Sequence, residues 1–413
     1  MKKLIFLIIP IFIYADGLKS LLEYASQNSD IVVSKELNQK AKELEVDSRE
    51  SAYFPTIDVG AFYQTLDERT PMQSGDIYSG FAKLSFDVYD GGKKSALLDK
   101  SKNEFKASSF ESESAKKSLS LQIVQDFYNI KSLEASLASR QEAQKSLYEQ
   151  LQRMMKFVIA KVATSDDVDR LQAAYDTNTY EMESLKFQII SAKKNLELKV
   201  GKSVEKLDDS KFKEFEKHSL ELTDNIKALM ANKDALISSA DSLSSIYYPQ
   251  IKIEDTYSVY GYERYDATHP KGLDNQNKLM LSLNMRIFDM GSVSKSKEAI
   301  LINSQALNTE LSYSKKEQSM RYDLALDAIE IGNIKIKSAR SALVSAKSAF
   351  RTISKKYDAG IVDNIVYLDA LTSQTEAKSL YERALNDLQI AFASYYYYAG
   401  KNIEEFIKWK KQF

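Results

Sequence analysis

The chain repeats one pattern of sequence markers at a fixed separation. Gly92 and Gly201 of the first copy correspond to Gly291 and Gly400 of the second, and the offset is 199 residues in both cases (291 − 92 and 400 − 201). Repeats of solenoid proteins are much shorter, at roughly 20–50 residues. The separation therefore predicts one fold with two similar halves, which we place at residues 16–201 and 202–413.

Each half contains one predicted strand hairpin, at residues 56–88 and 250–288. A proline opens each hairpin: Pro55 follows Tyr53-Phe54, and Pro249 follows Tyr247-Tyr248. The residue before a proline prefers extended geometry, so the preceding helix should end there. In the last predicted strand, 278–288, every second residue is apolar and the residues between them are mostly polar, as in a strand with one buried face. Its apolar set is Leu279, Leu281, Leu283, Met285 and Ile287.

The four predicted strands have the length of membrane-spanning β-strands, which is about 9–11 residues. Aromatic residues at their ends fit the interfacial girdles of outer-membrane barrels. The apolar set of the last strand would then face lipid. Four strands cannot close such a barrel, because the smallest bacterial forms have eight. Two chains would supply eight strands and three would supply twelve. Two ordinary soluble hairpins are the alternative, although isolated hairpins are marginally stable in water.

Very long helices are expected between the hairpins. No glycine or proline occurs between Gly92 and Val158, and only Gly332 interrupts residues 292–359. At about 1.5 Å per residue each helix could extend roughly 100 Å. Narrow apolar stripes at spacings of mostly three and four residues predict coiled-coil-like packing. The stripes are Leu119, Ile123, Phe127, Ile130 and Leu137 in the first copy, and Leu324, Ala328, Ile331, Leu343, Ala346 and Phe350 in the second.

Each long helix should turn and return, giving helical hairpins at about 92–200 and 292–400. Gly360 can take the left-handed conformation that ends a helix, and we match it with Ala160 in the first copy. Ser165 is a plausible N-cap for the returning helix of the first copy. The segments 203–218 and 401–413 are short and charged, and we treat them as candidate helices.

The first 15 residues read as a secretory signal. Lys2 and Lys3 precede an apolar run that ends in the small residue Ala15, as signal peptidase requires. The stretch is too short to cross a bilayer; an uncleaved anchor is the alternative. The chain has no cysteine, which excludes disulfides, thiolate metal sites and a lipidated N-terminal cysteine.

Composition gives no support for nucleic-acid binding or catalysis. The 57 basic and 58 acidic residues are interspersed and leave a net charge of −1, so no basic block marks a nucleic-acid surface. The two histidines, His218 and His269, are isolated in polar sequence and are expected on the surface. Because no catalytic constellation, phosphate loop or metal spacing occurs, we expect neither an enzyme nor a cofactor or metal site.

Taken together, these markers resemble the TolC-like outer-membrane efflux proteins over nearly the whole mature chain. No single motif is specific, but their order and doubled spacing are. The carriers are Tyr53-Phe54-Pro55, Tyr248-Pro249-Gln250, Asp90-Gly91-Gly92, Asp289-Met290-Gly291, Tyr357-Asp358-Ala359-Gly360 and Leu368-Asp369-Ala370.

The resemblance implies a mostly α-helical fold with a membrane β-barrel and two structural repeats per chain. A homotrimer would form a twelve-stranded barrel in the outer membrane of a Gram-negative bacterium and a long helical tube in the periplasm. Its partners would be outer-membrane lipid, a periplasmic adaptor and an inner-membrane pump. The function implied is the exit duct of a tripartite efflux or type I secretion system.

In this family the helical hairpin tips close the periplasmic end and meet the adaptor. The resemblance implies that Asp166, Asp169, Tyr357 and Asp369 form the gate. It implies that the tip turns, which contact the adaptor, contain Ala160, Lys161, Gly360 and Ile361. Asp369 follows Gly360 by the same nine residues that separate Asp169 from Ala160, so three chains would gather six carboxylates. Val362 stands where some members carry a gate arginine, so the closing contacts of this chain can differ.

A periplasmic adaptor-like coiled-coil scaffold without a pore is the alternative function. Such an adaptor should have β-rich modules flanking a single helical hairpin. This sequence predicts two hairpins of each kind, which disfavours the scaffold.

Overall fold

The computed structural model describes residues 17–68, 71–72 and 74–408, so the predicted signal sequence lies outside the described residues. Two compact units are formed, each from several segments of the chain. The helical unit contains Ser112–Asp224 and Ser314–Phe413 with the chain up to Lys35, and the sheet unit contains Glu36–Glu111 and Asn225–Tyr313. The long helices α3 (Lys93–Ile159) and α6 (Ser292–Asp358) contribute to both units.

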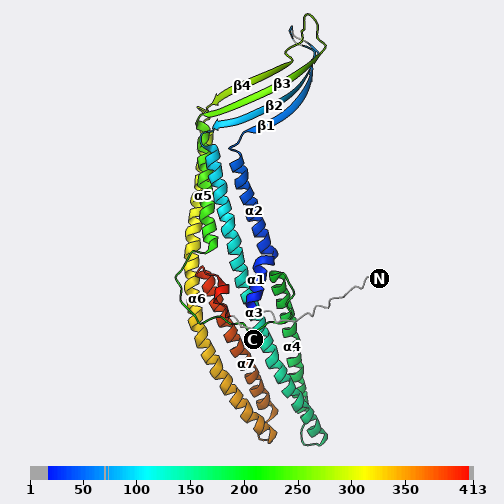
Figure 1. The fold of residues 1–413 in the computed structure, drawn as a ribbon. Coiled ribbons are helices and arrows are strands. Elements are labelled where there is room, and N and C mark those ends of the chain that lie inside the picture. The colour runs from blue at the N-terminus through cyan, green and yellow to red at the C-terminus, as the bar shows by residue number, and fades with distance from the viewer. Residues whose placement is uncertain (1–16, 69–70, 73, 409–413) are drawn as a thin grey trace, which may run out of the picture. The chain divides into compact units, whose positions relative to one another are not determined.

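Four antiparallel strands in the order β1-β2-β3-β4 form the sheet (Figure 1). Pairing of β2 with β3 joins the hairpin of one repeat to that of the other. The strands are β1 (Thr56–Thr65), β2 (Asp76–Tyr89), β3 (Gln250–Glu263) and β4 (Asn275–Asn284). Both predicted hairpins are present, but β4 ends before the predicted 288. Gln250, the first residue of β3, pairs with Asn284, so Met285 and Ile287 have no opposing strand residue within this chain.

One face of the sheet is apolar across all four strands. Directly paired residues project to the same side, and the register aligns Ile57 with Leu84 and Ile253 with Leu281. Leu281 is 69% exposed in the single chain. Asp255 is a charged exception in the middle of this face, paired with Leu84 and with a leucine of β4. At the end near the loops the same face also carries Asp76 and Glu263. The other face carries charged pairs such as Lys252 with Glu254, 3.0 Å apart. This division is what a strand between lipid and water requires.

An aspartate at each strand exit explains the repeated Asp-x-Gly markers. The carboxylate of Asp90 accepts hydrogen bonds from the backbone N–H groups of Gly92 and Lys94, at 3.0 and 2.7 Å. Asp289 caps the equivalent helix in the second copy through two bonds of 3.0 Å. These contacts satisfy N–H groups that have no partner in the first turn of a helix. The marker therefore fixes the start of each long helix.

The two helical hairpins are nearly equal in length, which confirms the two-repeat fold. Helices α3 (Lys93–Ile159) and α6 (Ser292–Asp358) both have 67 residues. The returning helices α4 (Ser165–Val200) and α7 (Asn364–Tyr398) have 36 and 35. The sheet unit also contains α5 (Asp224–Ser244) and most of α2 (Asp30–Ser51). None of the helices in the described residues is both long and apolar enough to cross a membrane.

The predicted apolar stripe of α3 is buried, whereas the first part of the α6 stripe is not. Ile123 and Phe127 are fully buried. In α6, Leu324 and Ile331 are exposed, and the neighbouring face containing Tyr322 is buried instead. The helix has two apolar faces, and spacing alone does not say which one its own chain covers; coiled-coil-like packing of the exposed stripe stays a prediction.

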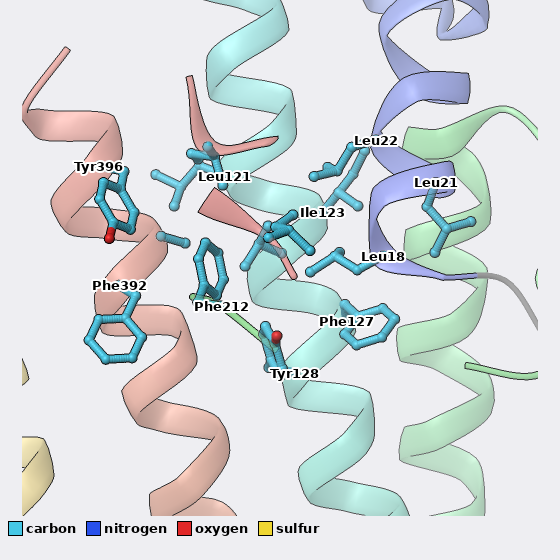
Figure 2. Close-up of a cluster of buried hydrophobic side chains, with 14 of the residues drawn as sticks. Leu18, Leu21, Leu22, Leu121, Ile123, Phe127, Tyr128, Phe212, Phe392 and Tyr396 are labelled. Carbon is cyan, nitrogen blue, oxygen red and sulfur yellow. The ribbon is translucent and has the colours of Figure 1, made fainter. Parts of the chain in front are cut away.

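The core of the helical unit joins α1 (Leu18–Asn28), α3 and α7 (Figure 2). Leu18 and Ile123 meet near its centre, and Phe212 packs against Phe392 and Tyr396 with ring centroids 6.2 Å apart. The segment 203–218, a candidate helix from its sequence, is not helical. It is mostly extended and includes a β-bridge between Phe212 and Ile407, beside a short 3₁₀ helix η2 (Ile403–Phe406).

His218 was expected on the surface, and this expectation was wrong. Its Nε2 is buried without a hydrogen-bond partner among the described residues, and its ring lies against Phe406 with centroids 5.1 Å apart. His269 is partly buried in a loop, where its Nδ1 lies 3.1 Å from a carboxylate oxygen of Asp266.

Candidate functional site at the helical hairpin tips

The two tip turns have the same backbone geometry. Lys161 and Gly360 each take a left-handed conformation, with φ of 56° and 72°. The next residue then donates its N–H to the carbonyl five positions back, at 3.0 Å for Val162 and 2.8 Å for Ile361. This pattern is the Schellman motif, in which the left-handed residue is usually glycine. Lys161 takes the same left-handed backbone conformation, although it has the Cβ that glycine lacks.

The turn geometry corrects the match between the two copies. The counterpart of Gly360 is Lys161 rather than Ala160, which restores the 199-residue offset of the whole repeat (360 − 161). The residue nine positions after Lys161 is Arg170, so Asp169 and Asp369 are not at equivalent positions. One residue of register corresponds to about 100° around a helix. The expected equivalence of the two aspartates is therefore wrong.

The three predicted gate aspartates are exposed near the starts of α4 and α7: Asp166 in the first turn of α4, Asp169 in its second turn, and Asp369 in the second turn of α7. Asp166 has a carboxylate oxygen 4.0 Å from Nε of Arg170, one turn further along α4. For Asp169 and Asp369, no hydrogen bond or ion pair links them to another described residue. Within one chain these carboxylates face solvent and do not form a cluster.

Tyr357 lies in the interior between the two hairpins. Its ring stacks on that of Tyr367, with centroids 4.8 Å apart and an angle of 25° between planes. Burial raises the pKa of Tyr357, and burial together with the neighbouring Tyr357 ring raises the pKa of Tyr367 to about 12. Both therefore remain neutral at physiological pH. The surrounding apolar cluster draws on α3, α4 and α7; it contains Leu147, Leu151, Met154, Leu171 and Leu371.

Arg153 of α3 is the tip residue that sequence reasoning missed. Its guanidinium forms an ion pair with Asp358 at the end of α6, and its Nη2 also donates to the backbone carbonyl of Asp358 at 3.1 Å. The same guanidinium lies over the rings of Phe157 and Tyr357, at 5.4 and 6.0 Å from their centroids. A cation at a helix C-terminus is favourable, but the sequence held no signal for this contact because its partners are 205 residues apart.

A second link between the tips is a side chain to backbone hydrogen bond. Asn364, almost fully buried at the start of α7, donates from Nδ2 to the carbonyl of Asp167, at 3.3 Å. The Tyr357–Tyr367 stack lies within the α6–α7 hairpin. Its packing against Leu151 and Leu171, the Arg153–Asp358 pair and this bond together hold the α3–α4 hairpin against the α6–α7 hairpin. We call these contacts the tip latch.

Exposed apolar side chains surround the turns. Ile159, Val162 and Ile361 are each at least 70% exposed, and Ile365 is also exposed. Ala160, Lys161 and Gly360 lie between them and are exposed as well. Exposed apolar groups on loops that carry little other structure are typical of protein contact surfaces. The tip turns therefore carry an exposed apolar surface with Lys161 within it.

Above the tips, a groove of about 1360 Å³ follows α3, α4, α6 and α7. Its walls carry charges of both signs, including Arg140, Glu181, Arg383 and Asp387. Arg140 donates a hydrogen bond from Nη1 to Oδ1 of Asn178 at 3.3 Å. This contact links α3 to α4, which is a structural role. Across residues 17–68, 71–72 and 74–408, no group of three or more histidines or carboxylates is placed to hold a metal ion.

Comparison with known proteins agrees with this geometry. A family model described as outer membrane efflux protein matches residues 21–202 and 217–401. No curated protein sequence matches. Among solved structures, the chain is similar to the Campylobacter jejuni CmeC outer membrane channel, with a TM-score of 0.83, 14% identity and coverage of 93% of this chain and 85% of CmeC.

Two further channels show the same fold. The outer membrane protein VceC of Vibrio cholerae gives a TM-score of 0.78 at 16% identity, covering 94% of this chain and 96% of VceC. The Neisseria gonorrhoeae MtrE channel in its open state gives 0.77 at 15% identity, covering 94% and 89%. The two stretches that the family model matches correspond to the two repeats, and the chain therefore belongs to the outer membrane efflux protein family.

Proposed function

We propose that three copies of this chain form the exit duct of a tripartite efflux or type I secretion system. The observation that carries the proposal is the four-stranded sheet with one apolar face and two free edges, β1 and β4. Unpaired backbone groups are costly in lipid, so a membrane sheet must close. Three copies give a barrel of twelve strands.

Unpaired apolar stripes on the helical unit support self-association. On α4, Tyr180 and Phe187 are over 70% exposed, and Leu198 continues the stripe. On α6 the exposed residues are Leu324 and Ile331, the part of the predicted stripe that its own chain leaves uncovered. Spacings of seven and eleven residues keep each stripe on one side of its helix. We assign the α4 stripe to contact with α6 of the next copy.

The tip latch would set the resting width of the channel entrance. Opening would move the α6–α7 hairpin away from the α3–α4 hairpin, breaking the Arg153–Asp358 pair and parting Tyr357 from the first hairpin. Asp166, Asp169 and Asp369 would supply negative charge at the entrance. Asp169 and Asp369 differ by one residue in register. In a trimer their carboxylates would therefore point in different directions or lie at different depths, and would not form a single ring.

The exposed apolar tips would contact a periplasmic adaptor, and through it an inner-membrane pump. Ile159, Val162 and Ile361 supply apolar contact area, and Lys161 adds a cation beside them. The predicted signal sequence at residues 1–15 supports export, and an outer-membrane location follows from the lipid-facing sheet. A wide duct leaves substrate choice largely to the pump.

Light scattering of the detergent-purified protein tests the architecture. We expect a mass of three chains and a conducting pore in planar bilayers. The Phe187→Asp variant should lose the trimer, whereas Lys186→Asp, beside it on a solvated face, should keep it. A stable monomer that conducts would refute the shared barrel. A protein that fractionates away from the outer membrane and never conducts would favour the pore-less scaffold.

A further inference from the structure

The face of the sheet opposite the apolar one carries an aromatic band near the β1–β2 and β3–β4 loops. The register aligns Phe62 with Ser79 and Ser79 with Tyr260. Phe81 and Tyr262 occupy the adjoining rows on the same face, because side chains alternate along each strand. We call Phe62, Phe81, Tyr260 and Tyr262 the aromatic band.

The band is unusual for its position. The interior of a membrane barrel is normally polar, and the rows nearer the helices follow that rule. They contain charged residues such as Lys83 and Glu254, whose side chains approach to 3.6 Å. In the rows of the band the strand residues are uncharged. Four aromatic rings thus lie among uncharged residues on the face opposite the apolar one, and lipid contact does not explain them.

Glycines hold the rings of the band in place. A Cβ at Gly60 would lie 2.5 Å from Cζ of Phe81, and a Cβ at Gly272 would lie 2.5 Å from the hydroxyl oxygen of Tyr262. Neither glycine has a positive φ, so backbone conformation does not require them. Glycine in a strand often marks close approach of another group. The Tyr262 hydroxyl also donates to the carbonyl of Leu273 at 2.8 Å.

Ser79 lies beneath the band with an unused polar atom. It is 4% exposed, and its Oγ has no hydrogen-bond partner among the described residues. A buried hydroxyl without a partner is unfavourable. Phe62 and Tyr260 flank it from strands two apart, or about 9–10 Å, and its hydroxyl is covered within this chain. Phe62 is 46% exposed, so its ring can stack with a planar ring at a centroid distance of roughly 4.5–7 Å.

We propose that the aromatic band binds planar aromatic groups of exported compounds as they leave the duct. A planar ring that parts the Phe62 and Tyr260 side chains would stack on both, and a polar atom on it would then reach the Ser79 hydroxyl. The inference rests on the proposed function, which places this face inside the barrel. It adds a specificity element of the outer-membrane component itself, in addition to any selection by the pump.

Single-channel recording with two cations of equal charge tests the band. Ethidium is planar and aromatic, and tetrapropylammonium is neither. In the wild-type trimer, ethidium added from the barrel side should cause longer blocking events than tetrapropylammonium. The Phe62→Leu/Tyr260→Leu variant keeps apolar bulk but loses both stacking faces, and should shorten the ethidium events on the order of 10-fold. Tyr63→Leu is the control, because Tyr63 follows Phe62 but faces lipid.

The possible outcomes distinguish failure of the aromatic band from failure of the proposed duct. Equal blocking by both cations in the wild type, or unchanged ethidium events in the double variant, would overturn the band. If the double variant does not assemble, the same recordings are made with Gly60→Ala, whose Cβ would displace the Phe81 ring. Unchanged ethidium events in Gly60→Ala would also overturn the band. A wild-type protein that does not conduct would contradict the proposed duct, independently of the band.

Discussion

Removing Arg153 should open the channel entrance. Its guanidinium is the ionic part of the tip latch, bound to both the carboxylate and the carbonyl of Asp358 and lying over two aromatic rings. The Arg153→Ala variant loses all of these contacts while leaving the Tyr357–Tyr367 stack in place. Because the contact joins the two hairpins, its loss should favour their separation.

The solvent exposure of Arg153 and Asp358 sets the expected free-energy change. The side chains of Arg153 and Asp358 are 33% and 48% exposed, so the pair itself is worth about 0.2–1 kcal/mol. The interaction with the helix end adds about 0.3–1 kcal/mol, and the cation–π contact with Tyr357 about 0.5–1 kcal/mol. The contact with Phe157 lies within α3 and does not join the hairpins. Since these terms overlap, we take about 1–2 kcal/mol per chain. If three chains open together, the total is about 3–6 kcal/mol, or roughly 10²–10⁴-fold in the open-to-closed ratio.

Conductance in planar bilayers measures this shift. Arg153→Ala should conduct more and spend more time open than the wild type. Arg170→Ala is the matched control, because Arg170 approaches Asp166 on its own helix and does not join the hairpins. A double-mutant cycle with Asp358→Ala should show positive coupling. Wild-type conductance in Arg153→Ala, with no coupling in the cycle, would refute the latch.

Three further predictions concern the sheet, the entrance and pH. Leu283→Arg should impair assembly by about 2–4 kcal/mol if it lies near mid-bilayer, while Ser282→Arg on the other face should be tolerated; equal yields of heat-modifiable trimer would contradict the facing. Trivalent cations should block conductance from the periplasmic side, and Asp169→Ala and Asp369→Ala should weaken the block to different extents, since their registers differ; an unchanged block in the double variant would place the entrance elsewhere. The pKa of Tyr367, raised to about 12, lies above the unfolded value of about 10, so the tip contact is fully stable below pH 10 and loses up to about 3 kcal/mol between pH 10 and 12; limited proteolysis at the tips should rise over that range, and an identical pH profile in Tyr367→Phe would refute the assignment.

Much of the fold could be predicted from the sequence because its signals are local and repeated. The two proline-marked hairpins, the long stretches without glycine or proline, and the Asp-x-Gly strand exits each depend on backbone geometry within a few residues. The 199-residue offset then required two similar halves. Strand alternation also identified one apolar face, although the end of β4 depended on where its partner β3 begins.

The tip was less predictable because its contacts join residues far apart in the chain. Counting from Gly360 matched it with Ala160, and only the left-handed backbone of Lys161 revealed the true counterpart. Tyr357 was correctly placed at the tip, but its stacking on Tyr367 was not foreseen, and Arg153 was missed altogether.

The sequence by itself determined the secondary structure, the duplication and the apolar face of the sheet, because periodicity and turn residues act over short distances. Only the tertiary structure decided which face of α6 its own chain covers, how the hairpin tips are joined, and which glycines seat the aromatic rings of the sheet. Each of these depends on which atoms from distant segments come within a few ångströms of one another, and periodicity along one segment does not encode that.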